Sequence, residues 1–191
     1  MWTQVRTSLL MLLALTILTG VVYPLAVTAI AQMTMSNQAN GSLIFDGDRI
    51  RGSRLIGRQF DDPKYFWSRP SATSPAPYNA AASSGSNYGP LSPELKRAVD
   101  ARVRALRMAD PANTQPIPVD LATSSGSGLD PEISPEAALY QAGRVARVRG
   151  LDEVAVRRLI ESITQQRQLG FLGEPRVNVV QLNQTLDKLR R

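Results

Sequence analysis

The feature that most constrains this chain is an uncharged apolar run near its N-terminus. Residues 9–31 read LLMLLALTILTGVVYPLAVTAIA and contain no charged side chain. As an α-helix this run would be about 34 Å long, because each residue adds about 1.5 Å. The hydrocarbon core of a bilayer is about 30 Å thick, so the run predicts a transmembrane helix over residues 9–31.

The charges beside this helix predict its orientation. Arg6 and the terminal amine precede it, whereas no charged residue follows until Asp46. The positive-inside rule therefore places residues 1–8 in the cytoplasm and residues 32–191 outside, in the periplasm of a bacterium. A cleaved signal peptide is the alternative, since Ala29-Ile30-Ala31 has cleavage-site spacing. We favour a retained anchor, because signal apolar regions usually span only about 7–15 residues.

The anchor also carries a stripe of small residues and a proline. Thr16, Gly20, Pro24 and Thr28 recur every four residues, so they follow one slowly drifting face of a helix. Small residues at this spacing let another helix approach closely, and Pro24 can bend the helix. Thr16, Gly20 and Pro24 are therefore expected contacts with a partner helix. The alternative is that Thr and Gly simply occur in a lone anchor.

Composition excludes several classes of chemistry. The 191 residues include no cysteine and no histidine, which removes thiolate nucleophiles, Ser-His and Cys-His dyads, structural zinc and haem ligation. Hydrophobic residues make up 43%, as in an ordinary folded protein, and the net charge is +6. A basic balance is typical of soluble surfaces, and nucleic acid is not an expected partner outside the cytoplasm.

Local patterns predict a single α+β domain after the anchor. Strands are expected at residues 42–45 and 50–56, around an Asp-Gly-Asp turn whose calcium-loop alternative lacks the remaining ligands. A long ordered loop follows, with five prolines over residues 68–93. Further strands are expected at residues 117–123 and 176–182.

Sequence signals for the starts and ends of helices occur in the second half of the chain. Ser92-Pro93-Glu94 and Ser134-Pro135-Glu136 each combine an N-cap, a proline at the first position and an early acid. They predict helices to about residue 108 and to Arg149. Asp152 should cap a third helix, closed by Gly170, and Asn183 a short final one.

The loop at residues 124–130, SSGSGLD, is the most suggestive local motif. Glycine-rich turns can direct backbone N–H groups at phosphate, and a helix start follows nearby. However, the loop lacks the Gly-Lys-Ser/Thr ending of a P-loop and the spacing of a dinucleotide fingerprint. From the residues alone, a structural turn is favoured over an anion site.

Two kinds of enzyme remain possible without histidine, and neither is favoured. Of the three lysines, Lys96 lies on an exposed helical face and Lys188 near the end of the sequence, which disfavours Ser-Lys catalysis. Adjacent Asp61 and Asp62 are expected to point apart, which disfavours a paired-carboxylate hydrolase.

Arginines concentrate on the two helices expected after residue 134. Arg144 and Arg147 share a face with Tyr140 at helical spacing. A solvated face is the ordinary interpretation. A docking surface for a partner protein through Arg144 and Arg147, or an anionic envelope ligand bound there, are the alternatives.

Several long motifs together resemble the KdpC family, the C subunits of the bacterial Kdp potassium-transporting P-type ATPase. The motifs, in order, are VVYPLAVTAIAQ, GSRLIGRQF, YFWSRPSA, SSGSNYGP, PVDLATSSGSGLDPEISPEAALYQAGRVARVRGL and FLGEPRVNVVQLNQTLD. They span nearly the whole chain, which makes the resemblance far more specific than any single glycine loop.

The resemblance implies a non-catalytic accessory subunit of a four-part inner-membrane complex. Its partners would be KdpA, which translocates potassium, KdpB, which hydrolyses ATP, and the small subunit KdpF, besides the lipid bilayer. The C subunit is described as a catalytic chaperone that raises the affinity of KdpB for ATP. No cofactor is expected to bind stably.

The resemblance also implies nucleotide-associated residues: Ser125, Gly126, Ser127, Gly128 and Gln141. This implication conflicts with the predicted orientation, because ATP is cytoplasmic and loop 124–130 should lie outside. The alternative is that the external domain caps the ion entrance of KdpA, so that any effect on ATP affinity passes through subunit contacts.

Overall fold

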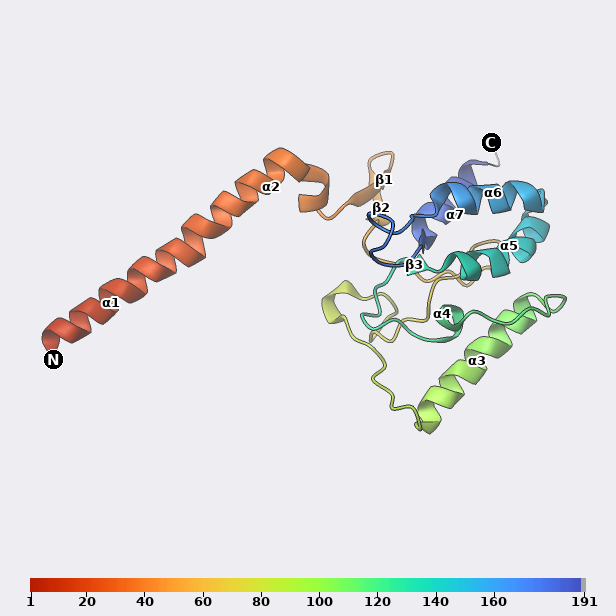
Figure 1. The fold of residues 1–191 in the computed structure, drawn as a ribbon, viewed down its shortest axis with the longest axis horizontal. Helices are drawn as coiled ribbons and strands as arrows, with labels where there is room; N and C mark the ends of the chain where they lie inside the picture. The colour runs from red at the N-terminus through yellow and green to blue at the C-terminus, as the bar shows by residue number, and fades with distance from the viewer. Residues whose placement is uncertain (190–191) are drawn as a thin grey trace. The chain divides into compact units, whose positions relative to one another are not determined.

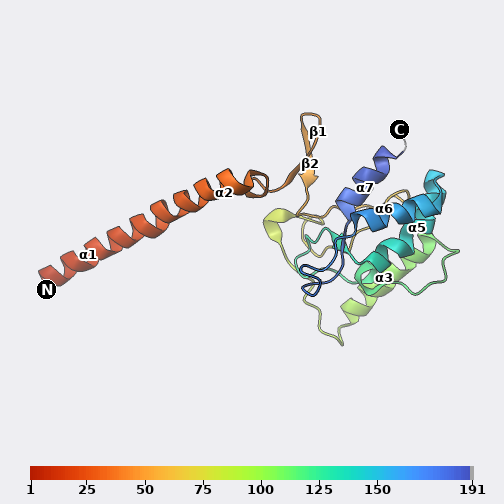
Figure 2. The same ribbon diagram turned by 45° about the horizontal axis from the view of Figure 1, so that its top comes forward.

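The computed structural model describes residues 1–189, and the chain divides into two compact units, Met1–Arg51 and Gly52–Arg191. Unit 1 is dominated by one long helical rod (Figures 1 and 2). It comprises α1 (Trp2–Ile17), the π-helical turn η1 (Leu18–Val22) and α2 (Tyr23–Ala39). By length and composition, Trp2–Ala39 is the one helix in the described chain that could cross a membrane.

The π-helical turn lies directly before Pro24. Proline has no N–H and its ring clashes with the carbonyl four residues earlier, here that of Gly20. A wider turn relieves such a clash, which explains why η1 ends at Val22, two residues before the proline. The helix continues beyond the expected membrane span of residues 9–31 to Ala39, with non-helical dihedrals at Met35.

A hairpin follows, with β1 (Leu43–Asp46) paired to β2 (Arg49–Ser53) as predicted. Unit 2 then contains a long irregular segment interrupted by η2 (Ala80–Ala82). Its remaining elements are α3 (Pro93–Ala109), α4 (Val119–Ala122), β3 (Glu132–Ile133), α5 (Pro135–Arg149), α6 (Glu153–Ile163), β4 (Val177–Asn178) and α7 (Val179–Lys188). The α+β class is confirmed.

The predicted helix starts are confirmed at their caps. Ser92 Oγ accepts hydrogen bonds from the backbone N–H groups of Glu94 and Leu95, and Ser134 Oγ accepts one from Ala137. Asp152 caps α6 through the N–H of Val154. Each side chain satisfies a backbone donor that has no partner within the first turn of its helix.

Four of the expected assignments are wrong. Residues 117–123 are not a strand, because Val119–Ala122 forms the short helix α4 around fully buried Leu121. Helix α6 ends at Ile163 rather than near Gly170. Residues 176–182 are a strand only at Val177–Asn178, and the cap of α7 is Asn178 rather than Asn183.

The core of unit 2 gathers on α5, with α6, α7 and the segment around Phe66 packed onto the same cluster. In Figures 1 and 2, α5, α6 and α7 lie together, and the irregular segment passes behind them. Strands β3 and β4 pair antiparallel, with Glu132 opposite Asn178 and Ile133 opposite Val177. This pairing joins the start of α5 to the start of α7.

Candidate functional site

Two buried amide side chains hold the extended segment at Phe66 and Trp67. The N–H of Phe66 donates to Asn183 Oδ1 at 2.9 Å, and Asn183 Nδ2 donates to the carbonyl of Phe66 at 3.0 Å. The N–H of Trp67 donates to Gln141 Oε1 at 2.8 Å, and Gln141 Nε2 donates back to its carbonyl at 3.1 Å. We call these four bonds the amide clamp. The amide clamp replaces the backbone hydrogen bonds that a neighbouring β-strand would supply.

Gln141 has no bonding capacity left for a ligand. Its Nε2 also donates to the carbonyl of Ala137, and its Oε1 also accepts from Arg144 Nη2 at 2.7 Å. The side-chain amide thus uses both donors and both acceptor sites, and the residue is only 1% exposed. The structure therefore places this expected nucleotide contact inside the core.

Two arginines lie over the ring of Trp67. The guanidinium carbon of Arg102 is 5.1 Å from the ring centre, and that of Arg144 is 4.9 Å away. Arg102 donates to the carbonyls of Leu121 and Ser68, and Arg144 to that of Pro63. These cations are therefore satisfied mainly by ring contacts and carbonyl oxygens.

Arg144, which was expected to be a docking residue, is almost fully buried. It is 2% exposed, and this desolvation lowers the pKa of its guanidinium to about 10. Burial likewise lowers the pKa of Arg102, with the charge of Asp61 opposing the shift. Helical spacing placed Arg144 on one face with Tyr140, but the guanidinium of Arg144 lies over the ring of Trp67.

Arg147 lies at the edge of a shallow cavity of about 170 Å³ and pairs with the buried carboxylate of Asp110. The pair Glu153–Arg157 lines the same cavity, so its charges are mutually compensated. Within the described part of the chain, the Tyr140 hydroxyl is buried there without a hydrogen-bond partner. Docking through Arg147 stays a prediction.

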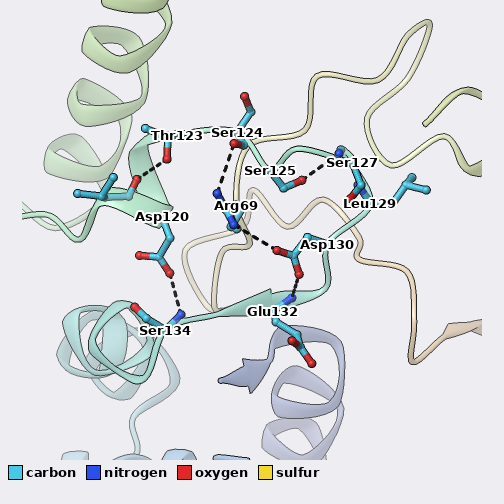
Figure 3. A network of polar contacts seen from close by, with 12 residues as sticks. Arg69, Asp120, Thr123, Ser124, Ser125, Ser127, Leu129, Asp130, Glu132 and Ser134 are labelled. Atoms are coloured by element: carbon cyan, nitrogen blue, oxygen red, sulfur yellow. Dashed lines mark hydrogen bonds and ion pairs between the residues drawn. The ribbon is translucent and has the colours of Figure 1, made fainter. Parts of the chain in front are cut away.

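Loop 124–130 packs against two earlier segments of the chain (Figure 3). Arg69 donates to the carbonyl of Ser124 and pairs with Asp130 at 3.2 Å. Ser71 Oγ donates to the carbonyl of Gly128 at 2.7 Å, and the N–H of Ser84 donates to the carbonyl of Ser127.

Two serine side chains of this loop also accept hydrogen bonds from the loop's own backbone. Gly128 has φ of +68°, and its N–H donates to Ser125 Oγ at 2.9 Å. The N–H of Leu129 donates to Ser127 Oγ at 3.1 Å. Ser125 and Gly128 are buried, whereas Gly126 and Ser127 are exposed. Two backbone donors that could have faced a phosphate are thus used inside the loop, as in a structural turn.

The expected partner-helix residues lie in three successive parts of the rod. Thr16 is in α1, Gly20 in the π-helical turn and Pro24 in the first turn of α2. A Cβ atom added at Gly20 would meet nothing within 4 Å, so its surface is open in unit 1. Their contact with a partner helix stays a prediction.

Sequence reasoning missed the amide clamp, because one buried Gln and one buried Asn give no periodic signal. The position of Asn183 did indicate burial, because it fits the helical series of Val179, Leu182 and Leu186. Among the described residues, no three His, Cys, Asp or Glu side chains are grouped to hold a metal ion.

Comparison with known proteins gives consistent results over the whole chain. The family model described as KdpC, K+-transporting ATPase, c chain, matches residues 5–188. A potassium-transporting ATPase KdpC subunit of Herpetosiphon aurantiacus is 61% identical over 190 residues, covering 100% of this chain and 98% of the relative. The subunits of that name from Methylococcus capsulatus and Dechloromonas aromatica are 58% and 56% identical, with at least 97% of each chain covered.

Proposed function

Because the chain belongs to the KdpC family of K+-transporting ATPase c chains, we propose that it is the non-catalytic accessory subunit of an ATP-driven potassium uptake complex. Its partners would be the translocating subunit KdpA, the ATP-hydrolysing subunit KdpB and the small subunit KdpF. The match across residues 5–188 carries this proposal, since it includes the candidate membrane helix as well as unit 2. The subunit would stabilise the assembly from within the membrane.

The proposed effect on ATP affinity is indirect. Gln141, Ser125 and Gly128 are committed to bonds within unit 2, which favours an effect transmitted through subunit contacts over direct contact with nucleotide. Coupling free energies between sites are typically about 1–3 kcal/mol, or roughly 5- to 150-fold in affinity. Unit 2 would lie on the periplasmic side and cap the ion entrance of KdpA, while the anchor packs against that subunit through Thr16, Gly20 and Pro24.

The test is the ATP dependence of potassium-stimulated hydrolysis by the purified complex. Removing the chain should raise KM for ATP, whereas Ser127→Ala, at an exposed loop position, should leave KM unchanged. Isothermal titration of the isolated chain with ATP should give no binding heat. A KM that rises about tenfold in Ser127→Ala would instead mean that the loop contacts nucleotide, because tenfold corresponds to about 1.4 kcal/mol of lost interaction.

A further inference from the structure

A short hairpin with an apolar tip projects from unit 2 between α6 and β4, the blue loop before α7 in Figure 1. The backbones of Gln165 and Arg176 exchange hydrogen bonds of 2.9 and 3.0 Å, and those of Gln168 and Leu172 exchange two of 2.9 Å. Gly170 N–H also donates to the carbonyl of Arg167 at 3.2 Å. The tip is therefore preformed.

Three of the four residues from 169 to 172 are large, apolar and exposed. Leu169 is 82% exposed, Phe171 68% and Leu172 47%. Single exposed apolar residues are ordinary, whereas three within four residues of one turn are not. The core of unit 2 uses none of these side chains.

The backbone conformation at position 169 is one that a leucine does not favour, so the fold does not require a leucine there. Its φ is +53°, in the left-handed region where Gly, Asn or Asp are favoured over other residues. Gly170, with φ of +82°, follows the ordinary preference. A glycine or asparagine at position 169 would make the same turn with less strain, so the apolar side chain calls for a role outside the fold.

The charges beside the tip are paired internally. Arg167 forms an ion pair with Glu174, and Arg176 pairs with Glu132 at 2.9 Å. Loops that bind anionic lipids combine apolar residues with surplus Lys or Arg, which attract the headgroups. The rim of this tip has compensated charge, which matches a neutral apolar protein surface better than an anionic bilayer.

The base of the hairpin also lies where the chain enters unit 2. Asn178, the last residue of β4, donates from Nδ2 to the carbonyl of Arg54 at 2.8 Å. Unit 2 begins at Gly52, at the end of the segment that leads from the candidate membrane helix. The base of the hairpin is therefore bonded to the first residues of unit 2.

We infer that Leu169, Phe171 and Leu172 dock into a neutral apolar depression on the non-cytoplasmic face of a membrane-embedded subunit of the same transporter. This inference rests on the proposed function, because it takes the partner from the assembly that the family implies. The preformed tip would bind without the entropic cost of ordering a loop.

The test places a photoreactive benzoyl-phenylalanine at position 171 of the full chain, expressed with the other subunits in native membranes. The matched control carries it at Met108, which is 79% exposed on α3. Irradiation should link position 171 to one membrane-embedded subunit, identified by mass spectrometry, and position 108 to it far less. Links to lipid alone, no links, or equal links from both positions would overturn the inference.

Two variants supply an independent readout. Phe171→Asp should weaken retention of the chain on the purified complex by roughly tenfold or more, as for loss of an interface anchor, whereas Phe171→Leu should stay close to wild type. Unchanged thermal unfolding of unit 2 in both would show that folding is intact. Full retention of Phe171→Asp overturns the hairpin inference alone, whereas a wild-type chain that fails to co-purify with the subunits overturns the proposed function as well.

Discussion

At the scale of single residues, two buried amide side chains of unit 2 hold one extended segment. Gln141 and Asn183 come from different helices and bind the backbone of two consecutive residues, Phe66 and Trp67. Buried backbone groups without partners are costly, and no strand runs beside this segment in the described structure. The two amides therefore allow an irregular segment to cross the core.

The amide clamp makes a direct prediction. Gln141→Leu keeps similar volume but leaves the N–H and C=O of Trp67 unpaired, so the free energy of unfolding should fall by about 2–6 kcal/mol, at about 1–3 for each group. Chemical denaturation followed by tryptophan fluorescence measures this. Gln166→Leu, at an exposed position, should change stability little. Equal stability of both variants would contradict the structural role of Gln141.

Burial at Tyr78 predicts a dependence on alkaline pH. Desolvation raises the pKa of its phenol above the ordinary 10.0, and its hydroxyl donates to the carbonyl of Arg69 at 2.6 Å. The folded state thus holds this proton more tightly than the unfolded state. Its contribution to stability is complete below pH 10 and is lost as the pH rises through the folded pKa.

The measurement is a near-ultraviolet titration of tyrosinate. Subtracting the titration of Tyr78→Phe from that of the wild type should isolate a phenol that ionises later than an exposed tyrosine. Over the same pH range, Tyr78→Phe should lose less stability than the wild type. A difference titration with its midpoint at the ordinary value would contradict the assigned burial.

At the scale of elements, capping residues predicted where helices begin better than apolar patterns predicted strands. Ser92, Ser134 and Asp152 act locally, so the sequence alone contains their signal. Within IPVDLAT, Val119–Ala122 instead forms a helical turn, because Leu121 is buried and Asp120 accepts a hydrogen bond from the N–H of distant Ser134. That contact cannot be read from the local sequence.

The left-handed C-cap of α5 can be tested at Gly150. Its φ is +67°, and an added Cβ would meet no atom within 4 Å, so any cost is conformational. Gly150→Ala should lower the free energy of unfolding by about 1–2 kcal/mol, and Gly150→Asn by less. Gly89→Ala, with no positive φ and equal space, is the control and should be nearly neutral. Equal effects of Gly150→Ala and Gly89→Ala would exclude a conformational cost.

At the scale of the whole molecule, the long apolar helix and the α+β class were predictable because both rest on patterns repeated over many residues. The burial of the predicted site residues was not predictable in this way. Ser125, Gly128, Gln141 and Arg144 are buried, and their burial depends on contacts with residues up to 81 positions away. Motif reading shows which residue types occur together, but only packing shows which atoms remain free.

The absence of cysteine makes the predicted orientation directly measurable. Ser127→Cys, in the exposed part of the loop, should react with a membrane-impermeant maleimide added to intact spheroplasts. Gln4→Cys, before the apolar run, should react only after permeabilisation. This outcome follows from the charge asymmetry around the helix. The reverse pattern would place unit 2 in the cytoplasm and restore direct contact with ATP.

The amide clamp also governs the order in which unit 2 can fold. Trp67 and Gln141 are 74 residues apart, and Phe66 and Asn183 are 117 apart. When the chain emerges N-terminus first, the segment around Phe66 appears long before α5 and α7. Until then, the backbone groups of this segment must form their hydrogen bonds with water. Closing such distant contacts is intrinsically slow. Unit 2 should therefore fold as a whole after α7 has emerged, rather than progressively as the chain emerges.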